Sequence, residues 1–330
     1  MAKTYAILGA AGCFSVQTAL WLLDHAEPSK VIGVGRHPLP EDSFSLGVHR
    51  RKGYEYHAYH VTYEWEELLE LLDRERPEVI INFAAQGEGA LSWKKSWRYF
   101  ETNCVGLTRL VEHLGKRDWL ERFIHIGTSE LYGSVGHAVN EDHPIKPTNP
   151  YAVSKAAFDM HLECIRDVLG FRMNIIRPSN AYCPAQRLHR VIPKAVVLGL
   201  QGKKLPLQGG GAVRKSYFHA RDLARAIYLV SEKAPLGAIY NCGPKEPISI
   251  REIVEKTAQA LGMPFDDLVE MAPARQGEDA CYWLDSSRLM RDTGWAPQIS
   301  LEEGLAEMVE WGRAYLGNLQ EYPTDYVLRA

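Results

Sequence analysis

The sequence predicts an α/β protein built on a doubly wound parallel sheet, and three observations support this fold class. Short apolar runs alternate with longer segments of helical period across residues 1–180 of the 330-residue chain. The apolar runs are continuous rather than alternating, as expected of strands that are buried on both faces. A glycine-rich turn follows the first run and opens a helical segment, which is the usual start of a βαβ unit.

Six apolar runs are the candidates for the parallel strands, and they lie at 5–8, 31–34, 54–59, 79–83, 123–126 and 173–176. The segments between them carry apolar residues at steps of three and four, which predicts helices, most clearly over 96–115. A second clear helix is predicted over 150–169, because Asn149 is a favourable cap and Pro150 a favourable first-turn residue.

The pattern changes after Pro178. Helical segments are expected near 190–201, 220–232, 249–262 and 301–316, separated by turns rich in glycine and proline. We therefore expect residues 1–180 to form the sheet domain, with segments within 213–242 returning to it. Residues 181–330 are expected to form mainly a smaller lobe.

Composition excludes several classes of protein. A formal net charge of −3 gives no general attraction to nucleic acid or to a membrane surface. No window approaches the ~18 consecutive apolar residues of a membrane span, and the apolar run after Lys3 is too short for a signal peptide. Six cysteines without a CxxC pair indicate free thiols in a reducing cytoplasm and no metal site.

The glycine turn after the first strand is a candidate phosphate-binding site. Glycines there let the backbone approach a pyrophosphate, and the next helix directs its first N–H groups at the charge. The residues expected to hold the dinucleotide are Gly9, Gly12, Cys13 and Phe14. Arg36 follows the second strand, where an acid would bind the ribose hydroxyls of NAD and a guanidinium suits the 2′-phosphate of NADP. The sequence therefore favours NADP over NAD.

Four residues form a candidate catalytic group. Tyr151 and Lys155 lie one helical turn apart, on one face of the helix predicted over 150–169. The pKa of a free tyrosine is about 10, and a neighbouring ammonium is expected to lower it. Lys155 is also expected to hold the nicotinamide ribose. Thr128 and Glu130 follow the fifth strand at its carboxyl end, where Thr128 can bond the reacting hydroxyl and Glu130 can remove a proton from carbon.

These residues belong to a set of motifs that extends over essentially the whole chain. The motifs are GAAGCFS (9–15), NFAA (82–85), ETNCVG (101–106), TSELYG (128–133), YAVSK (151–155), RPSNAY (177–182) and GWAP (294–297). With them the chain resembles an extended short-chain dehydrogenase/reductase of the nucleotide-sugar epimerase/dehydratase group. The resemblance implies a Rossmann-type domain that binds NAD(P) and a smaller C-terminal lobe that binds a nucleotide-diphosphate sugar.

Two departures from the group's pattern lie near the adenosine end of the cofactor site. Ser15 stands where the third glycine of the turn is usual. His60 and Val61 stand where an aspartate is usual after the third strand. We therefore expect adenosine binding to differ in detail from that of the group.

Within the group, TSELYG and NFAAQ (82–86) are similar to GDP-mannose 4,6-dehydratase. The dTDP-glucose 4,6-dehydratases carry Thr-Asp-Glu, in which the aspartate is the acid that expels water. Ser129 stands in place of that aspartate here, which leaves Glu130 as the candidate for both base and acid. The segment from Asn180 to Gly211 nevertheless has the length typical of the dTDP-glucose enzymes.

The resemblance also assigns contacts residue by residue. Ala84, Ala85 and Asn103 would join Tyr151 and Lys155 at the cofactor. The expected substrate contacts are Gln86, Ser129, Asn180, Arg190, Arg214, Asn241 and Arg275. The arginines suit a diphosphate, because guanidinium forks match phosphate oxygens.

The leading functional hypothesis is dehydration of a nucleotide-diphosphate hexose to its 4-keto-6-deoxy derivative, with the cofactor recycled internally. An NADPH-dependent reductase of 4-keto-6-deoxy sugars is the first alternative. A decarboxylase or epimerase of the same group is the second. A non-catalytic cofactor sensor is disfavoured, because a sensor has no need of Thr128, Tyr151 and Lys155.

A homodimer is the expected assembly. The helices at 96–115 and 150–169 each carry one apolar stripe for their own sheet and further apolar or aromatic residues. Of the latter we expect Tyr99, Met160 and Leu162 to be exposed. Such residues suit a four-helix interface between two copies of the chain.

Overall fold

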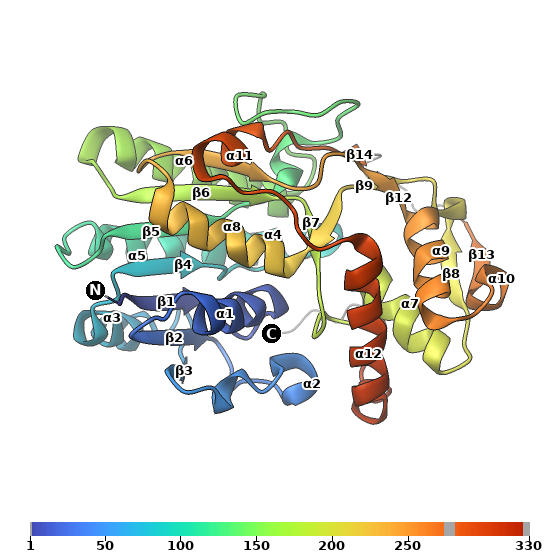
Figure 1. The fold of residues 1–330 in the computed structure, drawn as a ribbon. Coiled ribbons are helices and arrows are strands. Elements are labelled where there is room, and N and C mark those ends of the chain that lie inside the picture. The colour runs from blue at the N-terminus through green and yellow to red at the C-terminus, as the bar shows by residue number, and fades with distance from the viewer. Residues whose placement is uncertain (1, 274–280, 326–330) are drawn as a thin grey trace.

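The computed structural model describes residues 2–273 and 281–325, and its centre is a seven-stranded parallel sheet (Figure 1). The strands lie in the order β11-β6-β5-β4-β1-β2-β3. Their bounds are β1 Thr4–Leu8, β2 Lys30–Gly35, β3 Tyr54–Ala58, β4 Val79–Asn82, β5 Arg122–Ile126, β6 Met173–Pro178 and β11 Ile239–Cys242. Each of the six predicted runs forms a strand, and the predicted fold class is confirmed.

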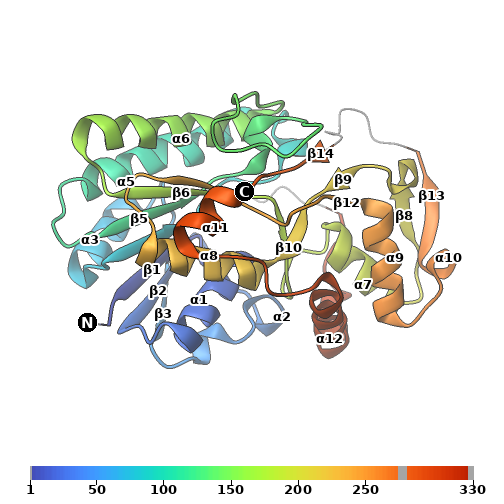
Figure 2. The same cartoon turned by 45° about the horizontal axis from the view of Figure 1, so that its top comes forward.

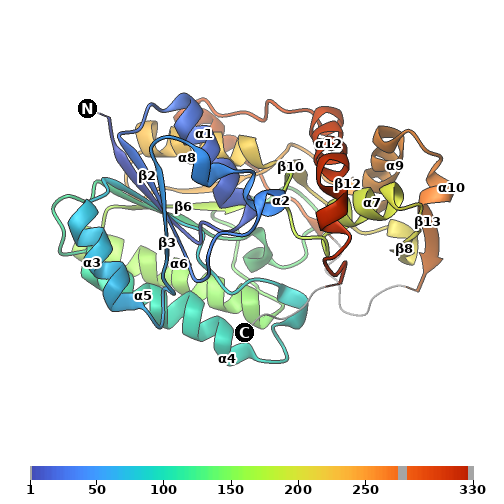
Figure 3. The same ribbon diagram turned by 90° about the horizontal axis from the view of Figure 1, so that it is seen from below.

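Helices cover both faces of the sheet, as Figures 2 and 3 show. On one face lie α1 (Cys13–His25), α8 (Ala220–Lys233) and α11 (Ser287–Thr293), packed on a core that includes Ile7. On the other face lie α3 (Trp65–Glu75), α5 (Leu107–Leu114) and α6 (Pro150–Leu169), packed on a core that includes Leu8. Successive residues of β1 thus serve opposite cores, which explains why its apolar run is continuous.

The helix predicted over 96–115 is interrupted by a wide turn. It consists of α4 (Ser96–Phe100), a π-helical segment at Glu101–Gly106 and then α5. The π-helical segment points Asn103 into the protein interior. Single π turns of this kind are frequent near functional sites.

Two of the three side chains expected at a dimer surface are buried instead. Tyr99 is 1% exposed and Leu162 is 0% exposed, whereas Met160 is 59% exposed. Leu162 lies in the core between α6 and the sheet, and Tyr99 directs its hydroxyl to the Glu88 carbonyl at 3.0 Å. The expectation of exposure was therefore wrong for Tyr99 and Leu162.

The C-terminal half adds a second group of helices beside the sheet. α7 (Val191–Leu200), α9 (Ile250–Leu261) and α12 (Leu301–Leu319) share an apolar core. The shorter elements are α2 Asp42–Ser45, α10 Phe265–Leu268, β7 Asn180–Tyr182, β8 Leu205–Gln208, β9 Arg214–Lys215, β10 Tyr217–His219, β12 Ile248–Ser249, β13 Val269–Ala272 and β14 Cys281–Tyr282. Short 3₁₀ helices lie at Val48–Arg50, Gly89–Leu91, Ser129–Tyr132 and Gly209–Gly211.

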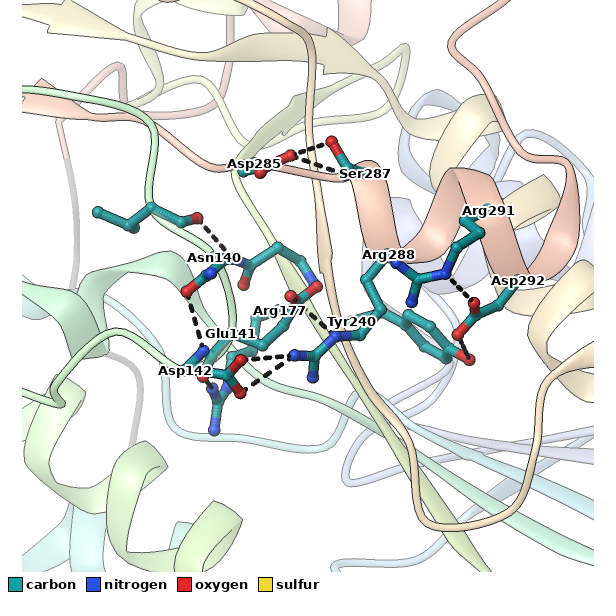
Figure 4. Close-up of polar contacts among 12 residues, drawn as sticks. Asn140, Glu141, Asp142, Arg177, Tyr240, Asp285, Ser287, Arg288, Arg291 and Asp292 are labelled. Carbon is teal, nitrogen blue, oxygen red and sulfur yellow. Dashed lines mark hydrogen bonds and ion pairs between the residues drawn. The ribbon is translucent and has the colours of Figure 1, made fainter.

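A network of polar contacts holds β11 and α11, which follow in the C-terminal half, against the rest of the sheet domain (Figure 4). Arg288 of α11 contacts both carboxylate oxygens of Asp142, at 3.0 and 2.9 Å, and lies 3.3 Å from Glu141. Glu141 in turn accepts the backbone N–H of Asn241 in β11 at 2.7 Å. The hydroxyl of Tyr240 donates to Asp292 at 3.1 Å. These contacts fix the edge strand β11 and α11 together.

None of the helices in the described residues combines the length with the apolar character that a membrane span requires.

Candidate active site

The turn after β1 is shaped for close approach of backbone to backbone. Gly9 has φ +77°, and a Cβ at this position would lie 2.7 Å from the backbone nitrogen of Ala84. Only glycine fits there, so the ends of β1 and β4 meet at the point where the strand order reverses. The hydroxyl of Ser15 donates to the carbonyls of Gly9 and Gly12, at 2.7 and 2.8 Å. The residue that replaces the third glycine therefore braces the turn.

The N-terminus of α1 lies directly after this turn, at the carboxyl end of β1. Gly12 is the residue before α1, and Cys13 and Phe14 begin the helix. Within the described chain no side chain caps α1, so its first N–H groups suit an anion. The geometry fits the pyrophosphate of a dinucleotide.

A cavity of about 270 Å³ opens beside the ends of β2 and β3. Its lining comprises Arg36, His37, His60, Tyr63, Glu64, Gln86, Arg98, Glu101 and Thr102. Arg36 contacts the side-chain oxygen of Gln86 at 3.5 Å. Burial, together with the charge of Arg36, lowers the pKa of His60. Two guanidinium groups thus line the place where a ribose is expected.

Asn149 joins the two halves of the catalytic group. Its Oδ1 accepts the N–H of Ala152 at 2.9 Å and so caps α6, as predicted. Its Nδ2 donates to Oε2 of Glu130 at 3.1 Å. One amide therefore fixes the start of the helix that carries Tyr151 and holds the carboxylate that follows β5.

Glu130 and Tyr151 lie in one half-buried site. Burial raises the pKa of Glu130, against the opposing effects of Asn149 and Arg190. Burial, followed by the negative charge of Glu130, also raises the pKa of Tyr151, while a hydrogen bond with Thr128 opposes this shift. Thr128 also accepts the N–H of Glu130 at 3.2 Å. Burial therefore favours the protonated forms of both Glu130 and Tyr151.

Lys155 does not act on Tyr151 in the way that the sequence suggested. Its Nζ donates to the carbonyl of Ile126 at 2.7 Å and lies 3.0 Å from Nε2 of His125. Burial lowers the pKa of Lys155 to about 8. The expectation that Lys155 lowers the pKa of Tyr151 is wrong for this structure, because the ammonium turns toward β5 and burial dominates the titration of the phenol.

A chain of buried polar side chains, which was not predicted from the sequence, lies beneath Lys155. His125 lies 2.9 Å from Nδ2 of Asn82 and 3.6 Å from Asp159. Asp159 accepts from Nε of Arg177 at 2.9 Å. All four side chains are buried. The spacing was a usable signal, because Asp159 follows Lys155 by four residues on one helix face.

Several assigned residues serve protein contacts. Asn103 accepts the N–H of Gln86 at 2.7 Å and donates to Ser154 at 2.9 Å, so it ties the loop after β4 to α6. Asn241 is fully buried; it accepts from the Tyr132 hydroxyl and donates to the Val139 carbonyl, both at 2.9 Å. Because both polar ends of its side chain are used inside the fold, the structure does not bring the Asn241 side chain to the cleft.

The other assigned residues are distributed around the cleft. Ala84 and Ala85 follow β4 and have accessible surface, and Ser129 is buried at the start of its 3₁₀ helix. Arg190 is electrostatically coupled to Glu130 and Tyr151. Asn180 begins β7, and Arg214, in β9, contacts the Pro247 carbonyl at 2.6 Å. Arg275 lies outside the described residues.

The phosphate-binding turn, the phenol and the neighbouring carboxylate together define an NAD(P)-dependent enzyme of the extended short-chain dehydrogenase/reductase type. The family model for GDP-mannose 4,6-dehydratase matches residues 45–308. A dTDP-glucose 4,6-dehydratase of Streptomyces niveus is 32% identical over 237 residues, which cover 72% of this chain and 70% of that protein. The chain therefore belongs to the GDP-mannose 4,6-dehydratase family of nucleotide-sugar enzymes.

Solved structures agree with this placement. The dTDP-glucose 4,6-dehydratase of Bacillus anthracis, in complex with NAD, is similar with a TM-score of 0.87 at 26% identity, over 97% of this chain and 99% of that one. DesIV of Streptomyces venezuelae, a double mutant of a dTDP-glucose 4,6-dehydratase with NAD bound, gives 0.86 at 28%, over 96% and 99%. A UDP-glucose 4-epimerase of Thermotoga maritima shares the fold, with a TM-score of 0.86 at 24% identity, over 95% and 99%.

The buried ammonium of Lys155 has a measurable effect on stability. Its pKa is about 8 in the folded chain, against about 10.4 in an unfolded one. Between these values the unfolded chain binds one more proton, so the free energy of unfolding rises with pH. From about pH 8 to about pH 10, we expect wild type to gain up to about 1.4 kcal/mol per pH unit over Lys155→Met in urea titrations. Lys116→Met, at an exposed site, is the control and should parallel wild type. Parallel curves for Lys155→Met would contradict the account.

Proposed function

We propose that the protein is a nucleotide-diphosphate-sugar 4,6-dehydratase that recycles its NAD(P). The observation that carries the proposal is the pairing of Glu130 with Tyr151. Oxidation of a hydroxyl needs only the phenol and the cofactor, whereas dehydration also needs a base for a proton on carbon. Asn149 holds such a carboxylate beside the phenol. Relatives named as dTDP-glucose 4,6-dehydratases support the same reaction.

A bound oxidised nicotinamide would supply a hydride acceptor for C4 and a hydride donor for C6, and its positive charge would favour the phenolate of Tyr151. Tyr151 accepts the proton of the C4 hydroxyl while Thr128 bonds the same oxygen. The new ketone acidifies the proton at C5. Glu130 removes that proton as water leaves from C6. Because burial raises the pKa of Glu130, the carboxyl group holds the proton more readily and can give it back to carbon.

We propose that residues 1–180, with the returning segments within 213–242, hold the cofactor, and that residues 181–330 mainly hold the sugar nucleotide. On this proposal Gly9, Gly12, Cys13 and Phe14 contact the pyrophosphate of the cofactor. Arg190 and Arg214, with Arg275, are assigned to the diphosphate of the substrate. The exposure of Arg190, which is half accessible at 52%, leaves its guanidinium room to meet a ligand.

The preferred cofactor on this proposal is NADP. The cavity beside β2 and β3 is lined by Arg36 and Arg98, and guanidinium groups bind phosphate oxygens well. Glu64 and Glu101 line the same cavity and act against an anion. NAD occupies the related structures from Bacillus anthracis and Streptomyces venezuelae, so the preference is a proposal specific to this chain.

The reaction is tested by incubating the enzyme with dTDP-glucose, UDP-glucose and GDP-mannose and weighing the products by mass spectrometry. We expect loss of water from one of them. Tyr151→Phe should form no reduced nicotinamide. Glu130→Gln should still form reduced nicotinamide and a 4-keto hexose, yet turn over about 10²–10⁴-fold more slowly, the usual scale for a positioned acid–base group. Loss of carbon dioxide, gain of two hydrogens, or full activity of Glu130→Gln would each rule out a dehydratase.

Arg36 should set the choice of cofactor. Arg36→Asp removes a partner of the 2′-phosphate and supplies an acid for the ribose hydroxyls, so the ratio of NADP to NAD affinity should fall at least about tenfold, a change of about 1.4 kcal/mol. Titration calorimetry with both cofactors measures the ratio. Arg50→Asp changes an exposed arginine that pairs with Asp42 and should leave it unchanged. An unchanged ratio in Arg36→Asp would show that Arg36 does not read the phosphate.

We also propose a homodimer through α4, α5 and α6. Trp97 and Met160 are 61% and 59% exposed, and Val105, Val153 and Phe100 add apolar surface. Light scattering at micromolar concentration should give a dimer for wild type and a monomer for Trp97→Glu/Met160→Glu. Met271→Glu, at an exposed site on β13, should stay dimeric. A monomeric wild type would rule out the interface.

A further inference from the structure

Dehydration also needs an acid that protonates the leaving oxygen at C6. The inference about this acid rests on the proposed function. The hydroxyl at C6 leaves readily only if it receives a proton. Ser129 stands where the aspartate of the dTDP-glucose enzymes would supply that proton, and a serine hydroxyl is a very weak acid. If Glu130 gave the proton that it takes from C5 to the leaving oxygen, it could not return that proton to C5, so a second acid lets Glu130 serve C5 alone.

Glu88 lies beside this site in a strained backbone conformation. Its φ is +79°, which is uncommon for a residue with a side chain. The hydroxyl of Tyr99 donates to the Glu88 carbonyl at 3.0 Å. The ring of Tyr99 meets the ring of Tyr151 edge-on, with centroids 6.3 Å apart. Tyr99 thus contacts both the backbone of Glu88 and the ring of Tyr151.

Gly89, the next residue, lies directly beside the carboxylate of Glu130. A Cβ at Gly89 would lie 2.8 Å from Oε2 of Glu130. The loop after β4 therefore passes directly beside this carboxylate at Gly89. The charge of Glu88 raises the pKa values of both Glu130 and Tyr151, in each case after larger contributions that begin with burial. Glu88 and the catalytic group are electrostatic neighbours.

Glu88 is paired with an imidazole. Nε2 of His189 lies 3.3 Å from Oε2 of Glu88, and Arg190 lies 3.1 Å from the same oxygen. Both Oε2 of Glu88 and Nε2 of His189 are buried. Although burial opposes it, His189 and Arg190 lower the pKa of Glu88, so this carboxyl group is ionised near neutral pH. The carboxylate of Glu88 and the imidazole of His189 thus form a close polar pair.

We propose that His189, positioned by Glu88, is the general acid that protonates the C6 oxygen as water leaves. The electron pair of the C5–H bond forms the C5–C6 double bond, and its proton passes to Glu130. The C6–O bond breaks, and the oxygen takes the proton of the Glu88–His189 pair and departs as water. The hydride taken from C4 then adds to C6, and Glu130 returns its proton to C5.

The proton count closes over the whole cycle. Tyr151 has gained the proton of the C4 hydroxyl, and His189 has lost one proton to the departing water. Transfer of one proton from Tyr151 to His189, directly or through solvent, restores the starting enzyme. The sugar has lost one molecule of water, and no further oxidant or reductant is needed.

The test compares leaving groups. dTDP-glucose, or UDP-glucose if that is the substrate, is compared with its 6-deoxy-6-fluoro analogue, because fluoride leaves without a proton. His189→Asn and Glu88→Gln should dehydrate the natural sugar about 10²–10⁴-fold more slowly than wild type. Both should still form reduced nicotinamide and exchange the C5 proton with deuterated water. With the fluoro analogue both should eliminate at close to the wild-type rate, whereas Glu130→Gln should be slowed about 10²–10⁴-fold with either sugar.

A matched control is His113→Asn. His113 also pairs with a carboxylate, lying 3.1 Å from Asp73 at the contact of α3 and α5, and this variant should behave as wild type with both sugars. Wild-type dehydration by His189→Asn would overturn the proposal and leave Glu130 as both base and acid. An equal loss with the fluoro analogue would also overturn it, because the pair would then have only a structural role. Absence of water loss in wild type itself would instead refute the dehydratase function, together with this acid, before any variant is compared.

Discussion

The geometry of the site depends on the side chain of Asn149. Its oxygen caps α6 and its nitrogen holds Glu130, so the amide cannot be turned around without losing both bonds. Through the cap it sets where Tyr151 begins the helix. Through Glu130 it sets where the carbon base lies relative to the phenol. The two hydrogen bonds of Asn149 thus fix the end of β5, which carries Glu130, relative to the start of α6, which carries Tyr151.

Burial then gives these groups their chemistry. The same desolvation that raises the pKa values of Glu130 and Tyr151 lowers that of Lys155. The cost of burying Lys155 is offset by the carbonyl of Ile126 and by the chain from His125 to Asp159 and Arg177 below it. This chain spans β4, β5, α6 and β6, so catalytic positioning and the packing of the sheet rest on the same contacts.

The strands of the sheet and much of the site could be predicted from sequence patterns, for clear physical reasons. Continuous apolar runs marked the six buried strands, and Asn149 with Pro150 marked the start of α6. Contacts between distant segments left no such signal. β11 lies within the segment 213–242 that was expected to return to the sheet, although it was not identified there as a strand. Tyr99 is buried because its hydroxyl reaches the loop at Glu88. Spacing placed Lys155 near Tyr151 but could not reveal that its ammonium turns toward β5.

Residues in irregular segments were the hardest to predict. Glu88 and His189 lie in two separate loops, and contacts between distant segments, such as those of Glu88 with Tyr99 and His189, bring them together. Asn103 and Asn241 carry family-like patterns, yet the structure uses their amides to tie loops and strands together. A motif identifies the residue type at a position, whereas hydrogen-bond partners decide whether that residue faces a ligand.

The central claim is that one hydride leaves C4 of the sugar and returns to C6 within the same active site. Substrate that carries deuterium at C4 tests this most directly, with the position of the label in the product read by NMR. The account predicts that the deuterium appears at C6 of the 4-keto-6-deoxy product without net consumption of cofactor. Deuterium released into free reduced cofactor, or retained at C4, would contradict it.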